Sequence, residues 1–104
     1  MTYDAIIIGG GIVGMATGYK YQLKHPQHQI LVLEKERDFA MHQTGRNSGV
    51  IHSGVYYKPG SRKARTCTAG RLQLEAFAQE HGVAYDNCGK VIVATQPEEV
   101  PRLD

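Results

Sequence analysis

The stretch YDAIIIGGGIVG, residues 3–14, decides the fold of this chain. Its isoleucine run ends in glycines, as in a strand buried on both faces of a parallel sheet, so we expect a strand over 3–8. Apolar residues then recur at helical spacing until Pro26, which cannot continue a helix. A second apolar run, 29–34, completes a β-α-β unit with a right-handed crossover. The sequence therefore predicts an α/β chain, the Rossmann-like start of a three-layer doubly wound domain.

Three glycines in this stretch fit the phosphate-binding pattern GxGxxG between a strand and a helix. Gly9 permits the tight turn, Gly11 lets the backbone approach a pyrophosphate, and Gly14 allows close packing of the helix on the strand. Glu34 ends the second strand, where a carboxylate accepts hydrogen bonds from ribose hydroxyls and repels a 2′-phosphate. NADP is therefore disfavoured, while NAD and FAD both remain open. The predicted dinucleotide contacts here are Gly9, Gly11, Ile12, Val13, Gly14, Glu34 and Lys35.

The chain has the length of one small domain, 104 residues. The predicted elements are the β-α-β unit 3–34, a loop over 35–62, a helix over 63–81 ended by Gly82, short strands within 83–95, and the opening of a helix at 97–104. We expect residues 1–104 to be the amino-terminal part of a nucleotide-binding domain that is incomplete. Any substrate domain is then expected outside this sequence.

Composition excludes several classes of protein. With 41% hydrophobic and 21% charged residues the chain is globular, and a net charge of +2 is too small to indicate a nucleic-acid partner. The basic residues over 62–71 are interpreted as a solvated helix face. Cys67 and Cys88 lack the paired spacing of a zinc or redox site, so no metal is predicted. Without a signal sequence or a spanning apolar run, we predict a cytoplasmic protein and leave peripheral attachment to the inner membrane open.

A second motif fills residues 42–57, which combine small residues, hydrogen-bond donors and rings. Glycines at 45, 49 and 54 let the backbone lie against a ligand, and Arg46 can neutralise a phosphate. Such a segment suits a planar, polyanionic cofactor. The predicted cofactor contacts in it are Thr44, Gly45, Arg46, Asn47, Ser48 and Gly49.

The motifs together resemble a known family, the FAD-dependent oxidoreductases of the D-amino-acid oxidase and glycerol-3-phosphate dehydrogenase superfamily. YDAIIIGGGIVGMATGY (3–19) and LVLEKE (31–36) are similar to the amino-terminal fingerprint that the whole superfamily shares. TGRNSGVIHSGVYYKPGS (44–61) and CGKVIVAT (88–95) look most like the L-2-hydroxyglutarate dehydrogenases and oxidases within it. The resemblance covers nearly the whole chain.

This resemblance implies an FAD cofactor, with residues 44–49 beside its pyrophosphate and ribityl chain. It further implies oxidation of a 2-hydroxy acid, foremost L-2-hydroxyglutarate to 2-oxoglutarate, by hydride transfer to flavin N5. His52 is then the candidate catalytic base, because imidazole suits proton transfer near neutral pH; a hydrogen bond to the flavin or to the backbone is its competing role. Tyr56 and Tyr57 are candidate substrate contacts, or else residues of an exposed loop.

Several alternatives remain open at this stage. An enzyme of the same superfamily could act on an amino acid or on glycerol 3-phosphate, and a chain of another class could be a non-catalytic nucleotide-binding fragment. The electron acceptor is equally open among oxygen, a quinone and another protein. Because later strands and the substrate domain are expected elsewhere, we predict that this chain alone is inactive.

Overall fold

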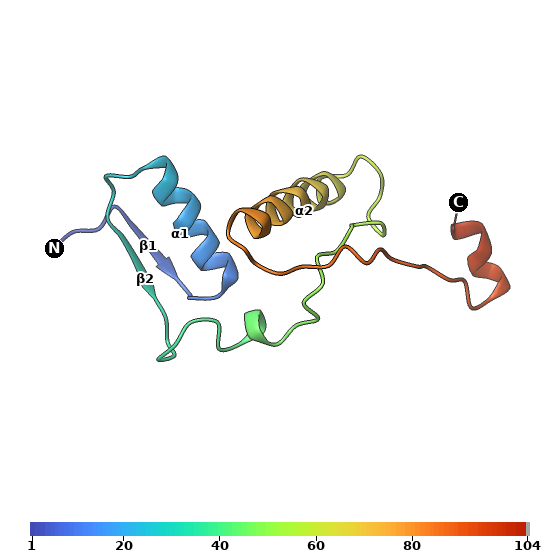
Figure 1. Cartoon of the computed structure of the whole chain (residues 1–104), viewed down its shortest axis with the longest axis horizontal. Helices are drawn as coiled ribbons and strands as arrows, with labels where there is room; N and C mark the ends of the chain where they lie inside the picture. Colours follow the sequence, from blue (N-terminus) through green and yellow to red (C-terminus); the bar gives the residue numbers. More distant parts are fainter. Residues whose placement is uncertain (104) are drawn as a thin grey trace. The chain divides into compact units, whose positions relative to one another are not determined.

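The computed structural model describes residues 1–103, and the chain divides into two compact units, Met1–Val50 and Ile51–Asp104. The first unit contains strand β1 (Ala5–Ile8), helix α1 (Ile12–Lys24), strand β2 (Ile30–Leu33) and the short 3₁₀ helix η1 (Gln43–Gly45). The second contains helix α2 (Arg62–Glu80) and the 3₁₀ helix η2 (Pro97–Arg102). Figure 1 shows each element by its label or its place in the chain.

The first unit is a β-α-β unit, as its sequence predicts. Its two strands pair in parallel, with Ile7 opposite Val32 and Ile8 opposite Leu33. Helix α1 connects them and contacts both strands. Lys24 is its last residue, because the chain turns at His25 and Pro26, where a helix cannot continue. The α/β start of a Rossmann-like domain is therefore confirmed.

Small residues bring α1 close to the sheet. A side chain at Gly18 would place its Cβ 3.0 Å from the Ile7 Cδ1 atom, and one at Gly14 would place it 3.3 Å from Ile7 Cγ2. The two glycines lie one helical turn apart, so they form one face of α1. This face packs on Ile7, while the neighbouring Ile6 and Ile8 point to the uncovered side of the sheet, 57% and 87% exposed.

The second unit is built on α2, whose two ends carry recognisable caps. The Ser61 hydroxyl accepts a hydrogen bond from the Ala64 N–H at 3.2 Å. At the other end Gly82 has φ +66°, and the Val83 N–H donates to the Ala78 carbonyl at 2.8 Å. This bond to the third residue from the helix end is the Schellman arrangement, and glycine is the residue that adopts its left-handed conformation without strain.

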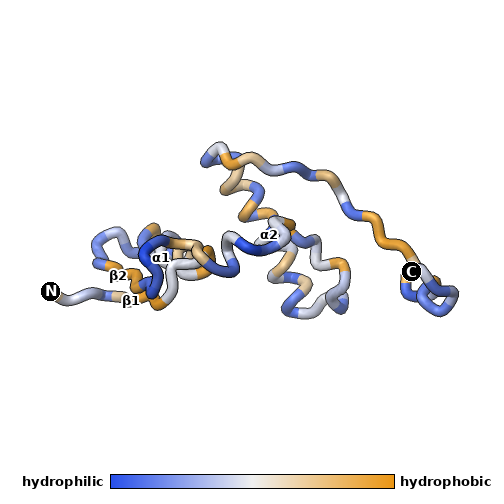
Figure 2. The backbone as a smooth tube through the Cα atoms, turned by 90° about the horizontal axis from the view of Figure 1, so that it is seen from below, coloured by the Kyte–Doolittle hydropathy of each residue, from blue (hydrophilic) through white to orange (hydrophobic). Residues whose placement is uncertain are grey.

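The strands predicted within 83–95 are not formed, which corrects that expectation. These residues lie in no strand of the described chain, although Val91 and Val93 are apolar and 86% and 72% exposed. Figure 2 shows an orange stretch of the tube shortly before the carboxy-terminal end. A strand needs the backbone hydrogen bonds of a neighbour, and no partner strand occurs among residues 51–103. After residues 83–95, η2 begins at Pro97. The Glu99 carboxylate accepts hydrogen bonds from the Thr95 and Gln96 N–H groups at the start of this helix.

Very little of the described chain is buried. Only Gly10, Gly18 and Ala78 are buried residues, so no large side chain is fully enclosed. Apolar area removed from water is the main favourable term in folding, at roughly 25 cal/mol per Å². The isolated segment is therefore expected to be weakly stable. Within the described residues, no helix combines the length and apolar character that crossing a membrane requires.

Candidate cofactor-binding site

The glycine turn between β1 and α1 is shaped by its missing side chains. Gly9 has φ +106°, a conformation that L side chains rarely adopt. A Cβ on Gly14 would collide with the Gly9 carbonyl oxygen, and one on Gly11 would lie 3.1 Å from the Thr44 hydroxyl. Each of the three glycines of the fingerprint is therefore required for a different structural reason. Without side chains, the turn leaves its backbone accessible to a pyrophosphate.

The amino terminus of α1 offers hydrogen-bond donors. Gly11 caps the helix without a side chain, and the Thr44 hydroxyl, 32 positions later than Ile12, accepts the Ile12 N–H at 2.9 Å. The N–H groups of Val13 and Gly14 have no hydrogen-bond partner among residues 1–103. Free N–H groups and the positive end of the helix dipole together favour an anion at this point.

Glu34 follows β2 directly and lies against the glycine turn. One carboxylate oxygen accepts the Gly10 N–H at 2.6 Å and the other accepts the Glu36 N–H at 3.0 Å. The donors at Glu36 and Gly10, in that order, hold the pKa of Glu34 below its ordinary value of 4.5. An ionised carboxylate has about four acceptor sites, so two protein bonds leave capacity for ribose hydroxyls.

Sequence reasoning missed Gly10 and the contacts made by residues 36–42. A Cβ on Gly10 would collide with the Phe39 ring, and the Gly10 carbonyl accepts the Ala40 N–H at 3.1 Å. The Glu36 carboxylate is 2.8 Å from His42 Nε2, and its distance to Lys35 Nζ is 3.9 Å. The signal that was available is the middle glycine of the run 9–11, which GxGxxG leaves unexplained.

The loop around η1 holds itself together through Asn47. Its side-chain amide donates to the carbonyls of Gln43 and Thr44 at 2.9 Å each, and its oxygen accepts the Gly49 N–H at 2.7 Å. Gly49 has φ +65°, which suits glycine. Asn47 thus orders the loop that brings Thr44 to α1, and its predicted contact with the cofactor stays a prediction.

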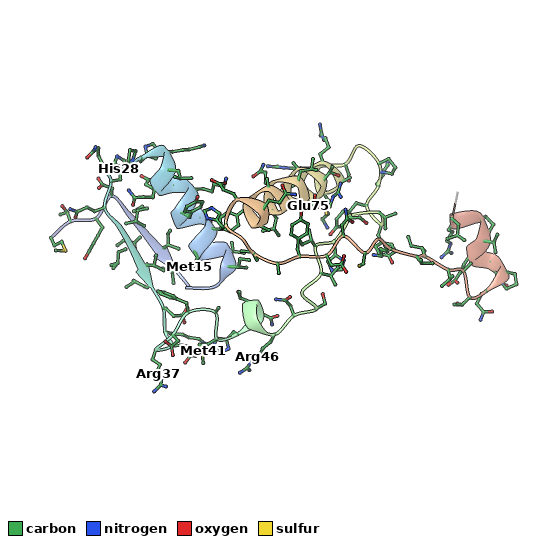
Figure 3. All side chains as sticks on the ribbon, viewed as in Figure 1. Met15, His28, Arg37, Met41, Arg46 and Glu75 are labelled. Carbon is green, nitrogen blue, oxygen red and sulfur yellow. The ribbon has the colours of Figure 1, made fainter. Side chains whose placement is uncertain are left out.

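Two other residues of this loop have free side chains. Arg46 and Ser48 are exposed and make no side-chain hydrogen bond or ion pair within the described part of the chain, and Arg46 projects from the ribbon in Figure 3. Both can therefore meet a cofactor phosphate without breaking an internal contact.

His52, Tyr56 and Tyr57 belong to the second unit. The Cys67 thiol on α2 donates to the His52 carbonyl at 3.3 Å, and a Cβ on Gly54 would lie 2.9 Å from the Cys67 sulfur. The His52 imidazole is exposed and has no partner in the described residues. Sequence reasoning missed Cys67 as the residue that holds this loop, because a lone thiol in a helix carries no pattern.

Tyr56 and Tyr57 each have a lysine near the aromatic ring. Lys90 Nζ lies 4.3 Å from the ring centroid of Tyr56, and Lys63 Nζ lies 6.0 Å from that of Tyr57.

The predicted site residues divide between the two units. Those up to Gly49 lie in the first unit, and His52, Tyr56 and Tyr57 lie in the second.

Comparisons with known proteins agree along the whole chain. The model of a family described as FAD dependent oxidoreductase matches residues 4–104. The mitochondrial L-2-hydroxyglutarate dehydrogenase of Homo sapiens is 55% identical over 102 residues, 98% of this chain and 22% of that protein. The L-2-hydroxyglutarate dehydrogenase of Indibacter alkaliphilus is 53% identical over 104 residues, 100% of this chain and 26% of that protein. The L-2-hydroxyglutarate dehydrogenase of Escherichia coli K12 is 54% identical over 101 residues, which are 97% of this chain and 24% of that protein. The chain spans about a quarter of the length of these relatives.

Proposed function

Because the chain belongs to the FAD dependent oxidoreductase family, we propose that it is the cofactor-side segment of a dehydrogenase that oxidises L-2-hydroxyglutarate to 2-oxoglutarate. The observation that carries the choice of substrate is identity of 53–55% over nearly the whole chain to the three relatives of that name. The full-length enzyme is this segment together with the rest of such a protein.

The residues of the first unit fit the phosphate and ribose parts of FAD. The open N–H groups of Val13 and Gly14 suit the pyrophosphate, and the backbone at Gly9 and Gly11 allows it to come close. The remaining acceptor sites of Glu34 suit the ribose hydroxyls. The other proposed contacts are Ile12, Lys35, Thr44, Gly45, Arg46, Asn47, Ser48 and Gly49.

Bound FAD supplies a two-electron acceptor at flavin N5. In the proposed reaction the C2–H bond of the substrate breaks with its electron pair, the hydroxyl proton leaves, and a C=O bond forms. His52 is the proposed base for the hydroxyl proton, since its exposed side chain makes no hydrogen bond among the described residues and imidazole is the side chain best suited to this role. Tyr56 and Tyr57 are proposed to line the substrate side of the same loop. Oxygen, a quinone or another protein would then reoxidise the cofactor.

An anaerobic spectrum of the full-length enzyme tests this function. After loading with FAD and desalting, the protein is expected to retain flavin absorbance, and L-2-hydroxyglutarate is expected to bleach it. The D-enantiomer is the matched control and should leave the spectrum unchanged. Bleaching by an amino acid or by glycerol 3-phosphate instead would move the enzyme elsewhere in its family. Retained adenine nucleotide without any bleaching would indicate a binding module.

A further inference from the structure

The middle of the chain has an unusual charge pattern. No aspartate or glutamate occurs from Phe39 to Leu74, although six lysines and arginines do: Arg46, Lys58, Arg62, Lys63, Arg65 and Arg71. Only Arg71 has an acidic partner in the described chain, Glu75 at 3.4 Å. Cations without acidic neighbours raise the local positive potential and attract anions.

Two of these cations line a hollow on α2. Arg62 and Lys63 form it together with Tyr57, Thr66 and Cys67, and its volume is about 470 Å³. The lining is largely apolar, and no carboxylate contributes to it. Two cationic side chains in a largely apolar lining suit an aliphatic carboxylate, because its chain can contact the apolar surface while its charge pairs with a guanidinium or an ammonium.

The hollow adjoins the loop that carries His52. Cys67, in its lining, donates its thiol hydrogen to the His52 carbonyl at 3.3 Å. Tyr57, also in the lining, is tied back to the loop by its N–H, which donates to the Gly54 carbonyl at 2.9 Å. A ligand in the hollow therefore lies beside the segment proposed to hold the reacting end of the substrate.

We infer that this hollow binds the second carboxylate of the substrate, the one at C5, through Arg62 and Lys63. The inference rests on the proposed function, because it takes a dicarboxylate as the substrate. L-2-Hydroxyglutarate carries one carboxylate next to the reacting C2 atom and another at the far end of its chain. Recognition of the far carboxylate separates it from 2-hydroxy acids with a single carboxylate, and Arg62 and Lys63 become specificity-determining residues.

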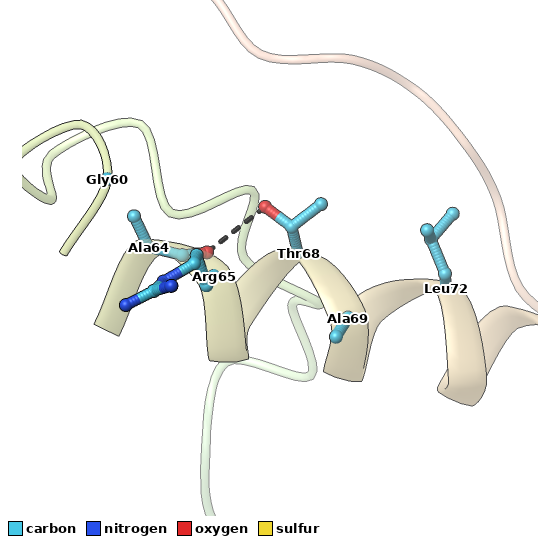
Figure 4. Close-up of a pocket in the computed structure, with 6 residues that line it drawn as sticks. All are labelled: Gly60, Ala64, Arg65, Thr68, Ala69 and Leu72. Atoms are coloured by element: carbon cyan, nitrogen blue, oxygen red, sulfur yellow. Dashed lines mark hydrogen bonds between the residues drawn. The ribbon is translucent and has the colours of Figure 1, made fainter. Parts of the chain in front are cut away.

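The opposite face of α2 provides a matched control. Arg65 lines a different hollow, together with Gly60, Ala64, Thr68, Ala69 and Leu72 (Figure 4). Arg65→Gln removes the same charge from the same stretch of helix as Arg62→Gln. It leaves the hollow beside Tyr57 intact.

The test measures the equilibrium dissociation constants of glutarate and pentanoate for the FAD-loaded full-length enzyme by calorimetry. These two ligands share a carbon chain and differ by one carboxylate. Lys63→Gln and Arg62→Gln are expected to weaken glutarate binding about 10- to 100-fold and to weaken pentanoate binding much less. Arg65→Gln should change either constant by no more than about twofold, and Lys63→Arg should restore most of the preference for glutarate.

Equal losses for both ligands, or equal effects of Arg65→Gln and Lys63→Gln, would overturn the inference. A weaker affinity for FAD in Lys63→Gln would also overturn the inference, because it would indicate that the Lys63 ammonium binds a phosphate of the cofactor. The wild-type spectrum separates this failure from failure of the proposed function. If L-2-hydroxyglutarate bleaches the flavin and the glutarate preference survives in both variants, only the assignment of the hollow is wrong.

Discussion

The two units of the chain use different means to present the groups proposed to be functional. In the first unit, backbone groups predominate: the Gly9 turn, the Val13 and Gly14 N–H groups, and a carboxylate held by two N–H donors. In the second unit, side chains on a loop predominate, and a thiol on α2 holds that loop. Backbone recognition depends on where glycines are placed, so it leaves a sequence pattern. Side-chain recognition depends on which loop lies against which helix, so it leaves almost none.

The largest expected effect comes from Gly14→Ala. The added Cβ would collide with the Gly9 carbonyl oxygen, which is backbone and cannot move without opening the turn. Overpacking typically costs about 1–3 kcal/mol, so we expect a lower melting temperature and loss of FAD from the full-length enzyme. Thermal unfolding and the flavin retained after desalting measure both. A variant that keeps its flavin and its melting temperature would show that the turn does not need this glycine.

A smaller effect is expected from Glu34→Gln. The variant loses the charged acceptor proposed for the ribose, and we expect FAD affinity in a flavin titration to fall about tenfold. Glu98→Gln, on η2, is the control and should bind FAD like the wild type.

The same carboxylate predicts a pH dependence. The pKa of Glu34 is lowered in the folded state by the Glu36 and Gly10 N–H groups, so the stabilisation it provides is complete above its ordinary value of 4.5. It is lost as the pH falls from there through the lowered folded value. The melting temperature of the wild type should therefore decline more steeply on acidification than that of Glu34→Gln. Parallel pH profiles would argue against these hydrogen bonds.

Thr44→Val tests the first unit further, because it removes the side-chain oxygen that accepts the Ile12 N–H at the amino terminus of α1. The Ile12 N–H loses its partner, which corresponds to loss of a helix cap at about 1 kcal/mol. Chemical denaturation of the full-length enzyme measures this loss. Thr44→Ser keeps the hydroxyl and should recover most of it; a Thr44→Val variant as stable as the wild type would contradict this role of the hydroxyl.

The smallest effect has the opposite sign. Gly70 lies inside α2, and a Cβ there would meet nothing within 4 Å. Gly70→Ala should stabilise the protein by about 0.5–1 kcal/mol, because alanine loses less backbone entropy in a helix. A glycine-to-alanine substitution is thus expected to destabilise the protein at Gly14 and to stabilise it at Gly70. Chemical denaturation measures both changes. Destabilisation by Gly70→Ala would mean that another element packs closely on α2 at this point.

How far the sequence predicts the structure follows the same division. The β-α-β unit was predictable because an apolar run, a glycine turn and Pro26 each act locally. The extended residues 83–95 were not, because a strand is defined by its neighbour, and β-branched residues alone do not provide one. The contact between Cys67 and His52 joins residues 15 positions apart across a turn whose path no local pattern specifies. The paired roles of Arg62 and Lys63 were equally hidden, since a basic helix face usually points to solvent.

The rate of anaerobic flavin reduction by L-2-hydroxyglutarate, in FAD-saturated His52→Asn enzyme, tests the central claim most directly. If the first unit binds the cofactor and the His52 loop acts on the substrate, this rate should fall about 10²- to 10⁴-fold, with the affinity for FAD unchanged. Glu34→Gln should do the reverse, binding FAD weakly but reducing it at the wild-type rate once saturated. A His52→Asn enzyme that reduces flavin as fast as the wild type, or that instead loses FAD, would contradict this division between the two units.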